Sequence, residues 1–281
     1  MTALIKQGWI RALLYFLVIL ALAITLQQPA GNLAAQLTKD VQLIFIISYC
    51  LMAAVFVLFT WLFKRIIDRE NFIDLGFHIK DYKADAGMGL FTAIAILGAG
   101  TLILILTQKI SITGTDFNPS ALALQLGLMI VVAFSEEIVF RGYILNNLLG
   151  SINKWVALFI SAALFALVHA SNPGANVLPV VNVFLAGLLL GMNYIFTRNL
   201  WFAILLHLAW NYLQGPVLGY KVSGLETQSL LQQYVTGSDL WTGGNFGFEG
   251  SLLCTALLAV AILLWAYLFS HKYPGAIKSQ E

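Results

Sequence analysis

The sequence predicts an all-α integral membrane protein, a polytopic bundle of about eight transmembrane helices. Composition gives the first two reasons. Hydrophobic residues make up 60% of the 281 residues, against about 45–50% in soluble domains. Charged residues make up only 10%, against about 25%, so too few charges are present to cover a soluble particle of this size. The net charge of +2 gives no sign of nucleic-acid binding, and we expect no nucleic-acid partner.

The third reason is the length of the apolar runs, because a helix needs roughly 20 mainly apolar residues to cross the hydrocarbon core. We expect the first run to be a retained helix rather than a cleaved signal peptide, since it is about as long as a full span and no clean cleavage site follows it. Asn118-Pro119-Ser120 is expected to start the fourth helix, while Asn172-Pro173-Gly174 and Gly215-Pro216 are expected to stop the fifth and seventh. The eight runs are residues 9–27, 41–63, 86–107, 121–146, 155–171, 177–197, 200–216 and 250–270.

Lysine and arginine residues predict the orientation, because they are in excess in cytoplasmic loops. With a cytoplasmic N-terminus and an even number of crossings, the other side carries only Lys39, Lys109 and Lys221. We therefore expect both termini in the cytoplasm. The cytoplasmic side then carries twelve basic residues: Lys6, Arg11, Lys64, Arg65, Arg69, Lys80, Lys83, Arg141, Lys154, Arg198, Lys272 and Lys278.

We expect residues 1–281 to form a single integral membrane domain with two long connections. Residues 64–85 form a charged cytoplasmic loop, which is either a lever between the second and third helices or a solvated connection. Residues 217–249 form an extracytoplasmic loop that either caps the bundle or is a flexible linker. Glu249, at the end of this loop, is a candidate for anchoring it.

Polar residues inside the apolar runs are the candidates for chemistry, because charged side chains in a bilayer usually face a bundle interior or a cavity. Glu136 has no cation placed beside it in its own helix, and it is a candidate general base. His169 lies on the next helix and is placed to hold a water against Glu136. His207 and Asn211 are four residues apart, so that they share a helix face and present two hydrogen-bond donors, as an oxyanion requires. A structural role in joining helices is the alternative for each of these residues taken singly.

Three further residues are expected to support these groups. Glu137 and Arg141 are four apart and are expected to form an ion pair, with two parallel hydrogen bonds. Phe165 lies one turn before His169 and is expected to pack under the site or against a substrate. Idealised helices put Glu136 nearer the cytoplasmic end and His169 nearer the outer end, an offset of roughly 10–15 Å. The gap closes only if residues 142–153 dip inward or the helices tilt or begin deeper.

The motifs Glu136-Glu137-x-x-x-Arg141, Phe165-x-x-x-His169 and His207-x-x-x-Asn211 occur in order on separate helices. In this they resemble the CAAX protease and bacteriocin-processing family, which is related to the Ras-converting CAAX prenyl endopeptidase. The resemblance covers residues 120–215 closely and implies that they form the catalytic core of an intramembrane endopeptidase, in a bacterial plasma membrane. It implies that residues matching Glu136 and His169 activate water, and that residues matching His207 and Asn211 stabilise the oxyanion.

Under this resemblance the expected partners are the lipid bilayer and a membrane-associated or lipidated peptide or protein, and no cofactor is expected. One alternative is a zinc protease with Glu136, His169 and His207 as ligands, although no His-Glu-x-x-His is present and Asn211 would lack a function. A second alternative is non-enzymatic, a bacteriocin self-immunity protein or membrane scaffold. A proton-coupled transporter is a third, but the inverted repeats typical of transporters are not found.

Overall fold

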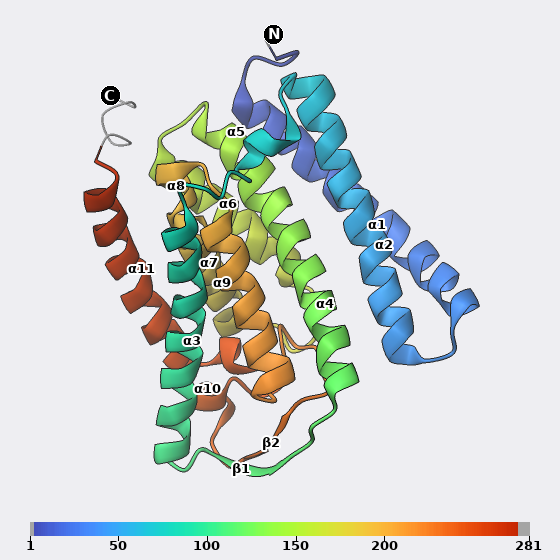
Figure 1. The fold of residues 1–281 in the computed structure, drawn as a ribbon, viewed down its shortest axis with the longest axis vertical. Coiled ribbons are helices and arrows are strands. Elements are labelled where there is room, and N and C mark those ends of the chain that lie inside the picture. The colour runs from blue at the N-terminus through green and yellow to red at the C-terminus, as the bar shows by residue number, and fades with distance from the viewer. Residues whose placement is uncertain (1–2, 275–281) are drawn as a thin grey trace.

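The computed structural model describes residues 3–274, which form a bundle of long helices with a small cap of loops at one end (Figure 1). Helices lie at all eight predicted stretches. They are α1 (Gly8–Leu37), α2 (Val41–Leu62), α3 (Lys83–Leu106), α4 (Pro119–Glu137), α6 (Lys154–His169), α7 (Val177–Met192), α9 (Trp201–Tyr212) and α11 (Leu252–Lys272). Short helical segments complete the helical part: α5 (Asn146–Leu149), α8 (Tyr194–Thr197) and α10 (Asp239–Thr242).

Six helical segments of the described chain are long and apolar enough to cross a membrane, which indicates a multi-pass membrane protein. Two of the eight predicted spans are shorter than this. Helix α6 has 16 residues and is only about 24 Å long at 1.5 Å per residue, whereas the hydrocarbon core is about 30 Å thick. Helix α9 has 12 residues before its geometry changes. The six candidate spans are Gly8–Leu37, Val41–Asp68, Lys83–Leu106, Pro119–Leu149, Val177–Thr197 and Leu252–Lys272.

Three helices continue as π-helical turns, in which the hydrogen bonds run from i to i+5. These are η1 (Phe63–Asp68) after α2, η3 (Ile138–Leu145) after α4 and η4 (Leu213–Val217) after α9. The predicted stop at Gly215-Pro216 therefore falls inside a π turn, and the regular part of the helix already ends at Tyr212. The predicted start at Asn118 is confirmed, because its side chain accepts a hydrogen bond from the Ala121 amide.

The fold is mostly helical, as expected, and the described residues add one small two-stranded sheet. Strand β1 (Ile110–Thr115) pairs in antiparallel fashion with β2 (Leu231–Val235), and an irregularity separates Ile112 from Gly114. The β1 sequence, Ile-Ser-Ile-Thr-Gly-Thr, alternates apolar and polar residues, a period-2 pattern that favours a strand. The sheet brings the α3–α4 connection beside the loop 217–249.

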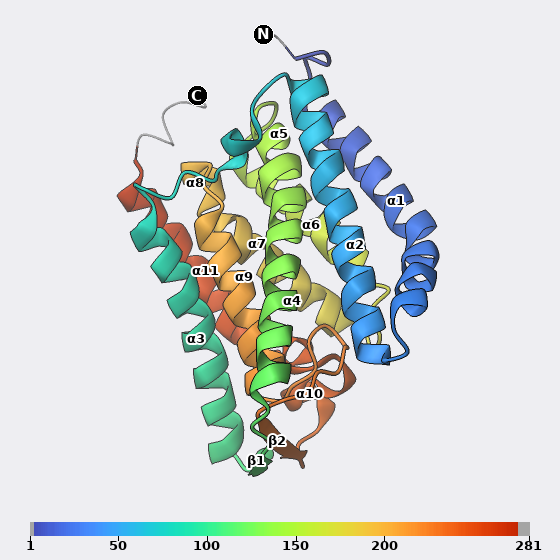
Figure 2. The same ribbon diagram turned by 45° about the vertical axis from the view of Figure 1, so that its right-hand side comes forward.

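Helix α9 lies at the centre of the fold and is packed by α3, α4 and α7. Most of its residues are buried, including Phe202, Ile204 and Leu206. In Figure 2, α4 lies between α9 and the α1–α2 hairpin. Of the six candidate spans, α1 and α2 are the least buried inside the protein.

The segment 64–85 contains short ordered turns, although most of its residues from Arg69 to Lys83 are exposed. It contains the π turn η1 and the 3-10 turn η2 (Phe72–Leu75). Asp68 is buried and accepts hydrogen bonds from Arg11 (2.9 Å) and Tyr143 (3.0 Å), and from Asn147 at 3.3 Å. This carboxylate therefore joins α1 and η1 to the η3–α5 segment.

Replacement of Asp68 by alanine is expected to lower the free energy of unfolding by about 3 kcal/mol, because it leaves the Arg11 guanidinium without its carboxylate, whereas Lys64 keeps its ion pair with Glu70. Denaturant titration in detergent measures the change. Asp81→Ala is the matched control, since Asp81 is exposed in the same connection. Equal stability of the two variants would show that the Asp68 network does not stabilise the fold.

Candidate active site

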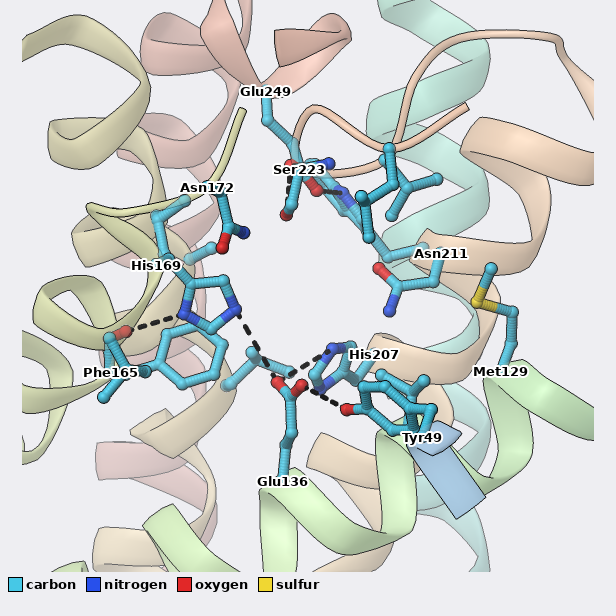
Figure 3. A pocket seen from close by; sticks show the side chains of 18 of the residues that line it. Tyr49, Met129, Glu136, Phe165, His169, Asn172, His207, Asn211, Ser223 and Glu249 are labelled. Carbon is cyan, nitrogen blue, oxygen red and sulfur yellow. Dashed lines mark hydrogen bonds and ion pairs between the residues drawn. The ribbon is translucent and has the colours of Figure 1, made fainter. Parts of the chain in front are cut away.

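The four predicted site residues lie on three helices and line one cavity of about 490 Å³ (Figure 3). Glu136 belongs to α4, His169 is the last residue of α6, and His207 and Asn211 belong to α9. The Nε2 atoms of His169 and His207 lie 3.8 Å and 3.9 Å from Glu136 Oε2. Phe165 and Glu249 also line this cavity.

The expected depth offset between Glu136 and His169 is wrong, because the fourth helix stays helical to Leu149 through η3 and α5. Helix α6 starts only at Lys154 and runs back beside it. The turn between α5 and α6 is about equally far along the chain from Glu136 and from His169. Both residues therefore lie about 20 Å from this turn. Helix α6 therefore ends at the level of Glu136.

The two oxygens of Glu136 have different surroundings. Oε1 accepts a hydrogen bond of 2.8 Å from the hydroxyl of Tyr49 on α2. Oε2 is buried and has no hydrogen-bond partner among the described residues. It faces the two imidazole Nε2 atoms at distances too long for direct hydrogen bonds. Since buried polar atoms are nearly always paired, Oε2 is an acceptor available to a water or a substrate.

The hydrogen bond at the other nitrogen of His169 determines its tautomer. Nδ1 lies 2.7 Å from the Phe165 carbonyl oxygen. A carbonyl only accepts, so Nδ1 carries the proton. In the neutral ring, Nε2 is then unprotonated and faces Glu136 and the cavity. The Phe165 ring packs on the His169 ring, with centroids 4.4 Å apart.

Glu137 forms the expected ion pair with Arg141, but not with two parallel hydrogen bonds. Arg141 Nη1 donates to Glu137 Oε1 at 2.8 Å, whereas Nη2 donates to the Gly187 carbonyl on α7 at 3.1 Å. Glu137 Oε1 also lies 2.8 Å from His207 Nδ1. The carboxylate only accepts, so Nδ1 of His207 donates to it. The ion pair therefore orients the His207 ring as well as compensating Arg141.

Asn211 follows His207 by one turn, and its carboxamide points into the cavity (Figure 3). No hydrogen bond to its side chain is found within residues 3–274. His207 Nε2 also faces the cavity, opposite the nitrogen bonded to Glu137. The shared helix face predicted for these two residues is thus the face that borders the cavity.

Glu249 anchors the loop 217–249 over the cavity, as expected. Its Oε1 accepts from Trp210 Nε1 at 2.9 Å, and its Oε2 accepts from the amide (3.1 Å) and hydroxyl (2.9 Å) of Ser223. Burial raises the pKa of Glu249, and the hydrogen bonds from Ser223 and Trp210 oppose this rise. Glu249 therefore ties the Ser223 part of the loop to Trp210 on α9, and the loop forms a cap, which the linker interpretation did not predict.

Sequence reasoning missed Tyr49, the hydrogen-bond donor to Glu136. Tyr49 lies inside the apolar run of α2, where a tyrosine is unremarkable in sequence. Its contact with Glu136 depends on the packing of α2 against α4, and no motif in the chain indicates that packing.

The zinc alternative requires three ligands that surround one point. Within residues 3–274, no group of three or more histidine, cysteine, aspartate or glutamate side chains is arranged to hold a metal ion. The arrangement instead resembles an acid–base site, because one free carboxylate oxygen lies between two imidazoles, with carboxamide donors nearby.

Part of the chain is similar to a known protein family. Residues 118–213 match the family of type II CAAX prenyl endopeptidases described as Rce1-like. The chain is also similar to the UPF0177 protein YxdF of Lactococcus lactis subsp. lactis (strain IL1403), with 40% identity over 76 residues, which are 25% of this chain and 41% of that protein. The chain thus matches about two fifths of the length of this relative. No solved structure matches.

The family match contains every residue of the three motifs, from Glu136 on α4 to Asn211 on α9. It covers the helices that supply the cavity's imidazoles and free carboxylate, and it leaves out the α1–α2 hairpin that supplies Tyr49. Residues 118–213 are therefore similar to the Rce1-like family of type II CAAX prenyl endopeptidases over the part of the chain that forms the cavity.

Proposed function

We propose that this protein is an intramembrane endopeptidase that hydrolyses a peptide bond of a membrane-associated peptide or protein. The observation that carries the proposal is the position of Glu136 Oε2, which is buried, unpartnered in the described chain and 3.8 Å from His169 Nε2. The family match supports the same reaction class. The proposal includes eight membrane helices, with α6 and α9 as short inner helices and both chain ends in the cytoplasm.

The nucleophile in this proposal is a water held between Glu136 and His169. A separation of 3.8 Å allows one water to lie about 2.8 Å from both atoms. Because Nδ1 of His169 donates to Phe165, its Nε2 accepts one hydrogen bond from this water. Glu136 Oε2 accepts the other and takes the proton as the water oxygen attacks the scissile carbonyl.

The tetrahedral oxyanion is stabilised by Asn211 and His207 in this mechanism. Asn211 donates through its Nδ2 hydrogens. His207 donates through Nε2, which requires both ring nitrogens to carry protons, since Nδ1 already donates to Glu137. Glu136 then gives its proton to the leaving amine as the carbon–nitrogen bond breaks, so that the products are an amine and a carboxylic acid, which ionises to the carboxylate. Glu137, Arg141 and Phe165 hold these groups in place without reacting.

Glu136→Gln is expected to reduce cleavage by about 10²- to 10⁴-fold, because the amide cannot accept the proton of the attacking water. Mass mapping of peptides incubated with purified wild-type and variant protein measures the loss. Glu226→Gln is the matched control, since Glu226 is exposed at the edge of the same cavity. Full cleavage by a folded Glu136→Gln protein would contradict the assignment.

Tyr49→Phe is expected to lower kcat while KM stays unchanged, because Tyr49 touches Glu136 and positions its carboxylate. A hydrogen bond to a charged group contributes about 1.5–3 kcal/mol, which corresponds to roughly ten- to a hundredfold in rate. Steady-state kinetics with a cleaved peptide separate the two constants. Tyr267→Phe, on the exposed face of α11, is the control. A rise in KM alone would assign Tyr49 to substrate binding instead.

Metal independence is part of the proposal and has its own test. Activity is expected to be unchanged after dialysis against a strong chelator, because no step requires a Lewis acid. Elemental analysis of the purified protein is carried out on the same samples. Loss of activity in chelator, restored by zinc and accompanied by bound zinc at one ion per chain, would favour the zinc alternative.

A further inference from the structure

The cavity has one closed end and one open end along the bundle. Glu136 marks the closed end. Beyond it, Glu137 and the whole of η3 (Ile138–Leu145) are buried, and the Tyr15 and Phe63 rings pack against Tyr143 further on. This buried segment lies between the cavity and the end of the bundle where α1 begins and α11 ends (Figure 1).

The open end of the cavity lies at the loops of the opposite end. Its wall there includes Gln27 on α1 and Leu225 and Glu226 in the loop 217–249, all of which are exposed. Figure 3 shows Ser223 and Glu249 across the cavity from Glu136. A molecule that reaches Glu136 along the bundle therefore enters past the loop 217–249.

Polar groups line this route, as a peptide backbone requires, because each peptide unit carries a donor and an acceptor. Asn172, Asn211, Ser223 and Thr227 all border the cavity. The Thr227 hydroxyl oxygen is buried and has no hydrogen-bond partner among the described residues. A purely hydrocarbon molecule forms no hydrogen bonds with these groups, whereas the backbone of an extended peptide does.

The basic residues indicate which side of the membrane this mouth faces. At the loop end of the bundle lie only Lys39, Lys109 and Lys221 in the described chain. Arg141, counted in the sequence as a loop charge, is buried in the bundle, and Lys278 lies outside the described residues. The remaining ten basic residues lie at the closed end: Lys6, Arg11, Lys64, Arg65, Arg69, Lys80, Lys83, Lys154, Arg198 and Lys272. By the positive-inside rule the closed end is cytoplasmic.

We propose that the site receives its substrate from the extracytoplasmic face, so that the substrate class is an exported or membrane-inserted peptide whose scissile bond lies outside the cytoplasm. This inference rests on the proposed function. In this inference the peptide enters past the loop 217–249. The tail of a cytoplasmic protein is then not a substrate of this chain.

Sided cysteine labelling tests the access route without requiring activity. Met129→Cys, in a chain whose Cys50 and Cys254 are alanine, places a thiol on the cavity wall at a side chain that is 5% exposed. We expect it to react with a membrane-impermeant cationic thiosulfonate in intact cells. Glu226→Cys is the matched control for the entrance and is expected to react in the same cells, whereas the exposed Lys80→Cys is expected to react only in everted vesicles. Failure of Met129→Cys to react where Glu226→Cys does, or its reaction only in everted vesicles, would overturn the inference.

Sided cleavage separates this inference from the proposed function. The probe is a quenched fluorescent library of mixed-sequence peptides with charged ends, which do not cross a bilayer. We expect cleavage by intact cells with wild-type protein, and loss of that cleavage with Glu136→Gln. Cleavage by everted vesicles alone overturns the access route and leaves the peptidase in place. Cleavage on neither side removes the peptidase proposal, and the labelling of Met129→Cys then still decides the route.

Discussion

One buried carboxylate, that of Glu137, holds the candidate site together. A single oxygen of this residue accepts from Arg141 and from His207, and Arg141 also reaches the Gly187 carbonyl on α7. The interaction therefore joins the α4–η3 segment, α7 and α9 at one point. An unpaired charge in such an interior is far more costly than a paired one, so the three elements separate only at a large energetic cost. The neighbouring Glu136 is free to face the cavity because Glu137 carries the structural role.

The π turn η3 begins directly after the two glutamates. Such turns are rare and occur frequently at functional sites. Here the helix passes from regular to widened geometry where Glu136 faces the cavity and Arg141 faces α7. The backbone of the turn also accepts a hydrogen bond, since the Ser161 hydroxyl on α6 donates to the Phe140 carbonyl. The irregular segment thus fixes α6 beside α4, which brings His169 to the level of Glu136.

Much of this site was predictable from sequence, because polar side chains inside apolar runs have to avoid lipid. Glu136, His169, His207 and Asn211 have no other place in a bundle than its interior, and their helical spacing predicts which of them share a face. Tyr49 cannot be predicted in this way, because a tyrosine is tolerated in an apolar helix. The sequence places Asp68 in the predicted loop 64–85 and does not indicate its burial, because its partners lie 57 to 79 residues away along the chain. The sheet between β1 and β2 depends in the same way on a partner more than a hundred residues distant.

The α1–α2 hairpin connects these observations, since it is the least buried part of the bundle and yet supplies Tyr49. At the end of the bundle where α1 begins, it is fastened by the Asp68 network. Towards the other end its contacts with the cavity come from apolar side chains such as Phe45 and Met52, and from the Tyr49 hydroxyl. Between helices in lipid the hydrophobic effect does not favour one set of apolar contacts over another, because lipid tails are equally apolar. The Tyr49–Glu136 hydrogen bond is therefore the specific tie at this level of the hairpin, and the geometry of the carboxylate is coupled to the position of the helix that forms the cavity wall.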